Sequence, residues 1–116
     1  MKKLMLVSVA AIAMLSFAFI EAAKDEKVTI IITHEVKDFA TWKIGYDADA
    51  PNRTAAGLKV LGLYRSIDNP NVVTLSMEAP NADVAKGFSA NPNLKAAMEK
   101  AGVISAPDFK FLSKVQ

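Results

Sequence analysis

The pattern of apolar and polar positions separates a leading apolar run from a longer region of short alternating segments. Within that region, residues 28–34 (VTIIITH) are rich in β-branched side chains and predict a strand. Residues 58–66 and 72–78 predict two more strands, joined by a turn that contains DNPN. A last strand is predicted at residues 109–115. Gly62 lies inside the second strand and indicates a bulge or a close approach by another group.

The interval after the first strand carries the pattern of a helix. Asp38 is placed to act as its N-cap, because its carboxylate can accept a hydrogen bond from a backbone N–H of the first turn. Phe39, Trp42 and Tyr46 follow at steps of three and four residues, so they share one helical face. Pro51 is expected to kink or interrupt this helix.

A second helical interval lies between the third and fourth strands. Asn81 can cap a helix over residues 82–89, and Asn91 can cap another that begins at Pro92 and stops at Gly102. The resulting order is βαββαβ, the split βαβ arrangement of the ferredoxin-like α+β class. Its sheet is expected to be antiparallel, with the helices packed on one face.

Both faces of the predicted sheet carry apolar side chains. Strict alternation in the second strand places one set on each face: Leu58, Val60 and Tyr64 against Leu61 and Leu63. An exposed apolar sheet face is uncommon on a soluble monomer. We therefore expect a second copy to cover it and to form a two-fold homodimer.

The leading segment has the pattern of a secretory signal peptide. Two lysines precede an apolar run at residues 4–20, and small residues follow. Residues 1–22 are interpreted as the signal peptide, with cleavage after Ala18 or Ala22. An uncleaved membrane anchor is the alternative. Cleavage predicts a periplasmic or secreted protein whose single domain spans residues 23–116 and has no membrane partner.

Composition excludes several classes of function. The chain has no cysteine and one histidine, which rules out the usual zinc and iron–sulfur sites. We predict neither a metal nor a cofactor. The sequence contains no GxSxG and no glycine-rich phosphate loop. The net charge is +2, and the sequence has no basic patch interleaved with aromatics. Nucleic acid is therefore not expected as a partner.

Two segments resemble a known family. They are HEVKDFATWKIGYDADAPNRTAAGLK at residues 34–59 and FSANPNLKAAMEKAGVISAPDFKFL at residues 88–112. Both are similar to the antibiotic biosynthesis monooxygenase (ABM) proteins, small dimeric α+β barrels. The resemblance implies a homodimer with a ligand cavity between the sheet and helices of each subunit. Members of the superfamily include oxygenases that act on aromatic polyketides without metal or flavin, and haem-degrading relatives.

His34 is the candidate catalytic residue. The ordinary pKa of histidine lies near neutrality, so His34 could act as a general base or donate a hydrogen bond to a phenol or quinone oxygen. The alternative is a structural role, in which His34 caps the strand end and hydrogen-bonds to loop backbone.

Four aromatic residues are the candidate pocket lining: Trp42, Tyr46, Tyr64 and Phe88. Core packing is the competing interpretation of the helical stripe formed by Phe39, Trp42 and Tyr46.

Other polar and apolar residues receive structural interpretations. Arg53 and Arg65 are interpreted as surface salt-bridge residues, with binding of an anionic ligand group as the alternative. Asp49 is interpreted as solvated. Leu94 and Met98 are interpreted as core residues.

Three hypotheses about function follow. The first is an exported binding module whose aromatic pocket holds a small aromatic or apolar ligand. The second is an ABM-like monooxygenase or isomerase that uses His34 as base and Trp42 or Tyr46 for orientation. The third is a structural or interaction protein without a pocket. We rank the first ahead because no complete catalytic set is assembled: the resemblance implies an asparagine beside the substrate, and no equivalent is identified.

Overall fold

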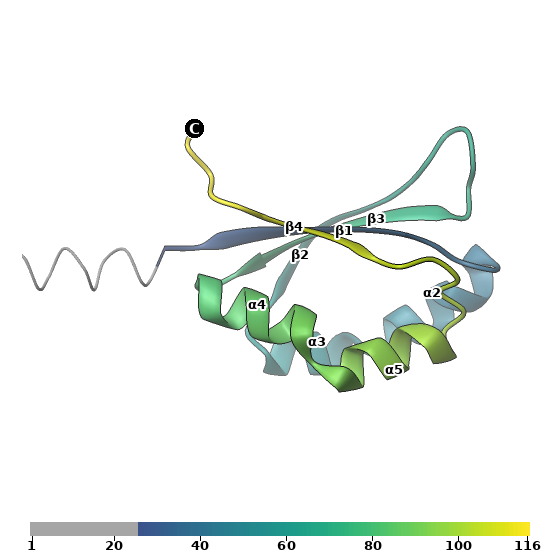
Figure 1. The fold of residues 1–116 in the computed structure, drawn as a ribbon, viewed down its shortest axis with the longest axis horizontal. Coiled ribbons are helices and arrows are strands. Elements are labelled where there is room, and N and C mark those ends of the chain that lie inside the picture. The colour runs from purple at the N-terminus through teal and green to yellow at the C-terminus, as the bar shows by residue number, and fades with distance from the viewer. Residues whose placement is uncertain (1–25) are drawn as a thin grey trace, which may run out of the picture.

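The computed structural model describes residues 26–116, which form one antiparallel sheet with helices on a single face (Figure 1). The strands are β1 (Val28–Glu35), β2 (Lys59–Arg65), β3 (Val72–Ala79) and β4 (Asp108–Leu112). The helices are α2 (Phe39–Ala48), α3 (Ala50–Ala55), α4 (Ala82–Ala90) and α5 (Pro92–Lys100). The strand order is β2-β3-β1-β4. The predicted ferredoxin-like α+β fold is therefore confirmed, although β4 ends earlier than predicted.

The predicted caps fix where the helices begin. The Asp38 carboxylate accepts hydrogen bonds from the Thr41 backbone N–H at 2.9 Å and from the Thr41 hydroxyl at 2.8 Å. These hydrogen bonds lower the pKa of Asp38. Asn81 and Asn91 cap α4 and α5 in the same manner. Pro51 lies in the first turn of α3, so the predicted interruption falls between α2 and α3.

A β-bulge in β2 changes which face its side chains occupy. Val60 pairs with Met77 and Gly62 pairs with Ser76, so Leu61 is the extra residue. After the bulge, the side chains point to the faces opposite those that strict alternation predicts. Tyr64 consequently lies opposite Thr74, on the face away from the helices. Of the two alternatives that Gly62 indicated, the bulge is confirmed, and the predicted alternation of the second strand is wrong.

The helix-free face is mixed rather than uniformly apolar. At its centre, the hydroxyls of Thr33 and Thr74 are hydrogen-bonded at 3.0 Å across β1 and β3. Ile31 lies half-buried beside them on β1, and the more exposed large apolar side chains lie on the outer strands, where Leu61, Tyr64 and Leu112 are 49%, 59% and 47% exposed. The homodimer predicted from this face stays a prediction.

The core lies between the sheet and the helices. Ile30 and Met77 are fully buried in one cluster, and Val36, Trp42 and Val73 form a second. In the part of the chain that the structure describes, no helix combines the length and the apolar character needed to cross a bilayer. The predicted signal peptide lies outside the described residues.

Candidate functional site

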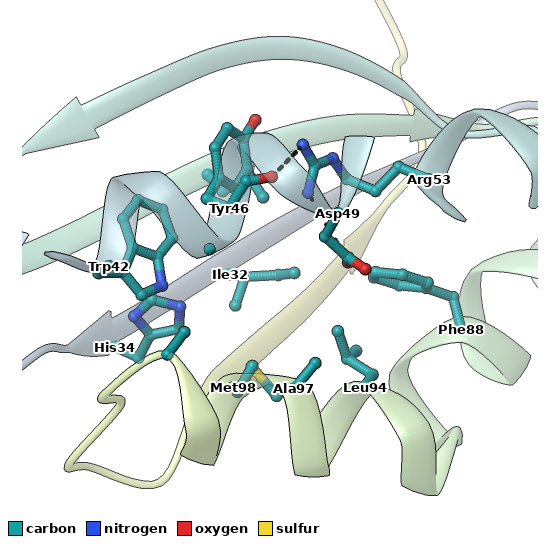
Figure 2. A pocket seen from close by; sticks show the side chains of 13 residues that line it. Ile32, His34, Trp42, Tyr46, Asp49, Arg53, Phe88, Leu94, Ala97 and Met98 are labelled. Carbon is teal, nitrogen blue, oxygen red and sulfur yellow. Dashed lines mark hydrogen bonds and ion pairs between the residues drawn. The ribbon is translucent and has the colours of Figure 1, made fainter. Parts of the chain in front are cut away.

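A cavity of about 60 Å³ lies between the helix-covered face of the sheet and the helices (Figure 2). The sheet contributes His34 and two aliphatic side chains to its floor. One wall is formed by α2, α3 and the residue between them, through Trp42, Tyr46, Asp49 and Arg53. The opposite wall is formed by α4 and α5, through Phe88, Leu94, Ala97 and Met98.

Most of the predicted site residues meet in this cavity. His34, Trp42, Tyr46 and Phe88 all line it. Tyr64 does not, because the bulge in β2 turns its side chain to the other face of the sheet. The prediction of Tyr64 as a pocket residue is therefore corrected.

His34 is enclosed at one end of the cavity. It pairs with Val73 of β3, on the helix-covered face, and is only 7% exposed. Its imidazole lies edge-on to the indole of Trp42, with ring centroids 5.5 Å apart. Burial lowers the pKa of His34, so the ring is neutral at neutral pH. Its buried Nδ1 has no hydrogen-bond partner among the described residues, so this atom is not engaged in the predicted cap to loop backbone.

The aromatic stripe of α2 serves as both core and cavity wall. The ring centroids of Trp42 and Tyr46 are 5.0 Å apart in a stacked arrangement, and Phe39 lies 5.8 Å from Trp42. Trp42 is 4% exposed and belongs to the core, yet one side of its ring borders the cavity. The two interpretations of this stripe are thus compatible.

Arg53 is buried at the cavity and is not a surface residue. It is 7% exposed, and its Nη2 donates a hydrogen bond of 2.8 Å to the backbone carbonyl of Tyr46. Its guanidinium carbon lies 3.9 Å from the Tyr46 ring centroid. Arg65 lies elsewhere, over the ring of Phe39. The prediction that Arg53 lies at the surface is wrong, whereas the predicted salt bridge is present as an ion pair with Asp49, with Arg53 Nη1 and Asp49 Oδ2 3.9 Å apart.

The sequence contains a signal that could have placed Asp49 and Arg53 at the cavity. Trp42, Tyr46, Asp49 and Arg53 follow one another at steps of four, three and four, which is the period of one continuous helical face. Pro51, which is expected to kink or interrupt the helix, lies between Asp49 and Arg53 in this series. In the structure, α3 follows α2 after a single residue and the face continues.

The wall opposite the aromatic stripe is more loosely packed. No residue of α5 is buried. Leu94 and Met98, which are predicted from the sequence to be core residues, are half-buried at the cavity instead. Past Asp49 and Phe88, a wider groove of about 340 Å³ adjoins the cavity. The inner cavity alone has room for about two water molecules. An aromatic ligand would therefore extend into the groove or displace α5.

The described residues contain no group of three or more His, Cys, Asp or Glu side chains placed to hold a metal ion. The chemistry that the cavity can support is hydrogen bonding at His34, ionic contact at Arg53 and apolar contact with the aromatic rings of Trp42 and Tyr46.

Comparison with known proteins identifies the fold. No family profile and no curated protein matches the sequence. A candidate antibiotic biosynthesis monooxygenase from Bordetella bronchiseptica is similar in structure, with a TM-score of 0.66, 20% identity, and coverage of 78% of this chain and 99% of that one. A second candidate antibiotic biosynthesis monooxygenase, from Caulobacter crescentus, has a TM-score of 0.63 and 20% identity. The match covers 83% of this chain and 96% of that one. SnoaB, a cofactor-independent oxygenase from Streptomyces nogalater, has a TM-score of 0.62 and 17% identity. The match covers 78% of this chain and 95% of that one.

The chain has the fold of the antibiotic biosynthesis monooxygenase proteins. The ABM-like fold implied by the sequence resemblance is thereby confirmed. At these identities the likeness concerns the fold alone, so the function is argued from the cavity.

Proposed function

We propose that this ABM-like protein is an exported homodimer that binds a small planar aromatic molecule in the cavity of each subunit. The observation that carries the proposal is the cavity itself, where a stacked aromatic wall faces a buried imidazole nitrogen without a protein partner. Pockets for small molecules combine an apolar lining with a few polar groups that fix orientation. His34 and Arg53 are such groups at this cavity.

The unpartnered nitrogen gives a physical reason for ligand binding. A buried polar atom left without a hydrogen bond costs about 1–3 kcal/mol. A ligand hydroxyl that donates to His34 Nδ1, or a ligand carbonyl that accepts from it in the other neutral tautomer, would recover much of that cost. The ring of such a ligand would pack against the wall formed by Trp42 and Tyr46.

Export and dimer formation are supported by separate features. The apolar run at residues 4–20 supports export to the periplasm or the medium. Leu61, Tyr64 and Leu112 supply exposed apolar area on the helix-free face, which supports association of two sheets face to face.

Cofactor-independent oxygenation is the second candidate, and the neutral state of His34 favours it. A neutral imidazole can accept the proton of a bound phenol, and the resulting phenolate is electron-rich enough to react with oxygen. The balanced outcome is oxidation of a phenol to a quinone, with one oxygen atom in the product and the other in water. SnoaB, a similar fold, is a cofactor-independent oxygenase.

Intrinsic fluorescence tests the binding proposal directly. Trp42 is the single tryptophan of the chain and lines the cavity, so its emission reports on occupancy. Titration of the purified protein with 1,4-naphthoquinone should give saturable quenching. Ala97→Phe, which places a ring in the cavity mouth, should weaken binding at least about tenfold. A failure to saturate would argue for the structural hypothesis.

The two tyrosines of the chain provide a matched control. Tyr46 lines the cavity and Tyr64 lies on the opposite face. Tyr46→Ala should weaken naphthoquinone binding about tenfold or more, and Tyr64→Ala should leave it within about twofold. Equal effects would place the bound quinone outside the cavity. Oxygen uptake with a naphthol, lost in His34→Gln, would add turnover to binding.

A further inference from the structure

We propose that Arg53 forms an anion subsite at the end of the cavity away from His34, and that Asp49 acts as a replaceable counter-ion there. The ligand class is then an aromatic acid whose carboxylate binds Arg53. This inference rests on the proposed function and specifies the chemistry of its ligand.

Arg53 carries a charge that is withdrawn from water but incompletely partnered. A guanidinium has five N–H donors. Among the described residues, the only hydrogen bond from the Arg53 side chain goes to the neutral carbonyl of Tyr46. A buried cation is costly unless an anion and further hydrogen bonds compensate it. The arrangement therefore leaves room for an anionic partner.

Asp49 supplies that charge without a hydrogen bond. Its carboxylate lies 3.9 Å from Arg53 Nη1, which is beyond hydrogen-bond distance. The same carboxylate accepts a hydrogen bond of 2.6 Å from the Asn52 side chain. Figure 2 shows it extending toward Phe88 instead of toward the guanidinium. Asp49 is thus held by Asn52 at the mouth, and Arg53 keeps donors for another acid.

The position of Asp49 suits a group that yields to a ligand. It lines both the inner cavity and the wider groove outside it, and its side chain is 29% exposed. An incoming carboxylate would pass Asp49 to reach Arg53. Because the Arg53 guanidinium lies over the Tyr46 ring and donates a hydrogen bond to the Tyr46 carbonyl, it is already held in place for that carboxylate.

The two polar ends of the cavity define a ligand with two functional groups. His34 and Trp42 lie at one end and Arg53 at the other, with the Tyr46 ring between them (Figure 2). An aromatic ring with a carboxylate at one end and a hydroxyl at the other matches this order. A hydroxybenzoate is a small probe of that kind, and because the inner cavity is only about 60 Å³, its binding between the two ends requires α5 to move outward.

A matched pair of probes tests the subsite. 4-Hydroxybenzoate and 4-hydroxybenzamide have nearly the same shape, and only the acid is charged. Titration followed by Trp42 fluorescence should show about tenfold or tighter binding of the acid. Arg53→Gln should abolish that preference. Arg65→Gln, which changes the same residue type outside the cavity, should retain it.

Asp49→Asn keeps the test decisive if Arg53→Gln does not fold. Removing the competing carboxylate should tighten binding of the acid severalfold and leave the amide within about twofold. Weaker binding of the acid in Asp49→Asn would overturn the role of Asp49 as a replaceable counter-ion.

The outcomes separate this inference from the proposed function. If the acid and the amide bind equally, or neither binds while 1,4-naphthoquinone does, the anion subsite is overturned and the binding cavity stands. If no probe binds, including the quinone, the proposed function fails and the subsite fails with it.

Discussion

The two faces of the sheet use the same strands for different purposes. On the helix-covered face, β1 and β3 bury Ile30, Met77 and Val73 and enclose His34. On the helix-free face, the same strands present threonines such as Thr33 and Thr74, which hydrogen-bond to each other. Stability and the candidate site are thus concentrated on one face, and the other is free to associate with a partner.

This division follows from the two-residue period of a strand. Neighbouring positions in β3 alternate between buried and half-buried along the whole strand. In β2 the single extra residue Leu61 resets the alternation, so Leu63 packs against the core and Tyr64 does not. One inserted residue therefore turns Tyr64 away from the cavity.

The largest contrast between the faces is expected in stability. Met77 is fully buried, and its neighbour Ser76 points to the other face. Met77→Ala should lower the free energy of unfolding by about 2–5 kcal/mol, because it leaves a cavity in the core. Ser76→Ala should change it by no more than about 0.5 kcal/mol. Chemical denaturation of both variants measures this, and similar costs would contradict the division.

Association should respond to the opposite face. Leu61→Lys places a charge in the exposed apolar area of the helix-free face and should raise the dimer dissociation constant about tenfold or more. Ile44→Lys is the matched control, since Ile44 is 72% exposed on α2 and lies outside that face. Light scattering over a concentration series measures both. A wild-type monomer at micromolar concentration would refute the dimer.

Local signals in the sequence were sufficient for the fold. Asp38, Asn81 and Asn91 each act through a short-range hydrogen bond to the next turn, so their roles as caps could be predicted from nearby residues. The helical face of Phe39, Trp42 and Tyr46 likewise depends only on the helical period. These residues were enough to predict where the helices begin and which side chains form the main wall of the cavity.

The remaining site residues depend on interactions that local patterns do not encode. Gly62 signalled a bulge, but the sequence did not show that Leu61 would be the extra residue, and Tyr64 was therefore assigned to the wrong face. Pro51 predicts an interruption of the helix. A proline is tolerated in the first turn of a new helix, however, so the helical face continues to Arg53 in α3.

The smallest expected effect is the pH dependence of stability that His34, a titratable group of the covered face, produces. Its pKa in the folded state is lowered below the ordinary value of 6.5 by burial, so the unfolded chain takes up a proton first as the pH falls. Wild-type stability should therefore decrease as the pH falls through 6.5 toward the folded-state pKa, and the loss should level off below it. His34→Gln should remove this component.

Unfolding free energies of wild type and His34→Gln, measured from about pH 8 to about pH 5, test this sign. The stability of wild type relative to the variant should shrink as the pH falls. Asp38, whose lowered pKa acts below this range, contributes equally to both proteins and cancels in the difference. Parallel curves, or a relative gain for wild type at low pH, would mean that water or a protein group solvates the imidazolium in the folded state. His34 Nδ1 would then already have a hydrogen-bond partner and would not be available to a ligand.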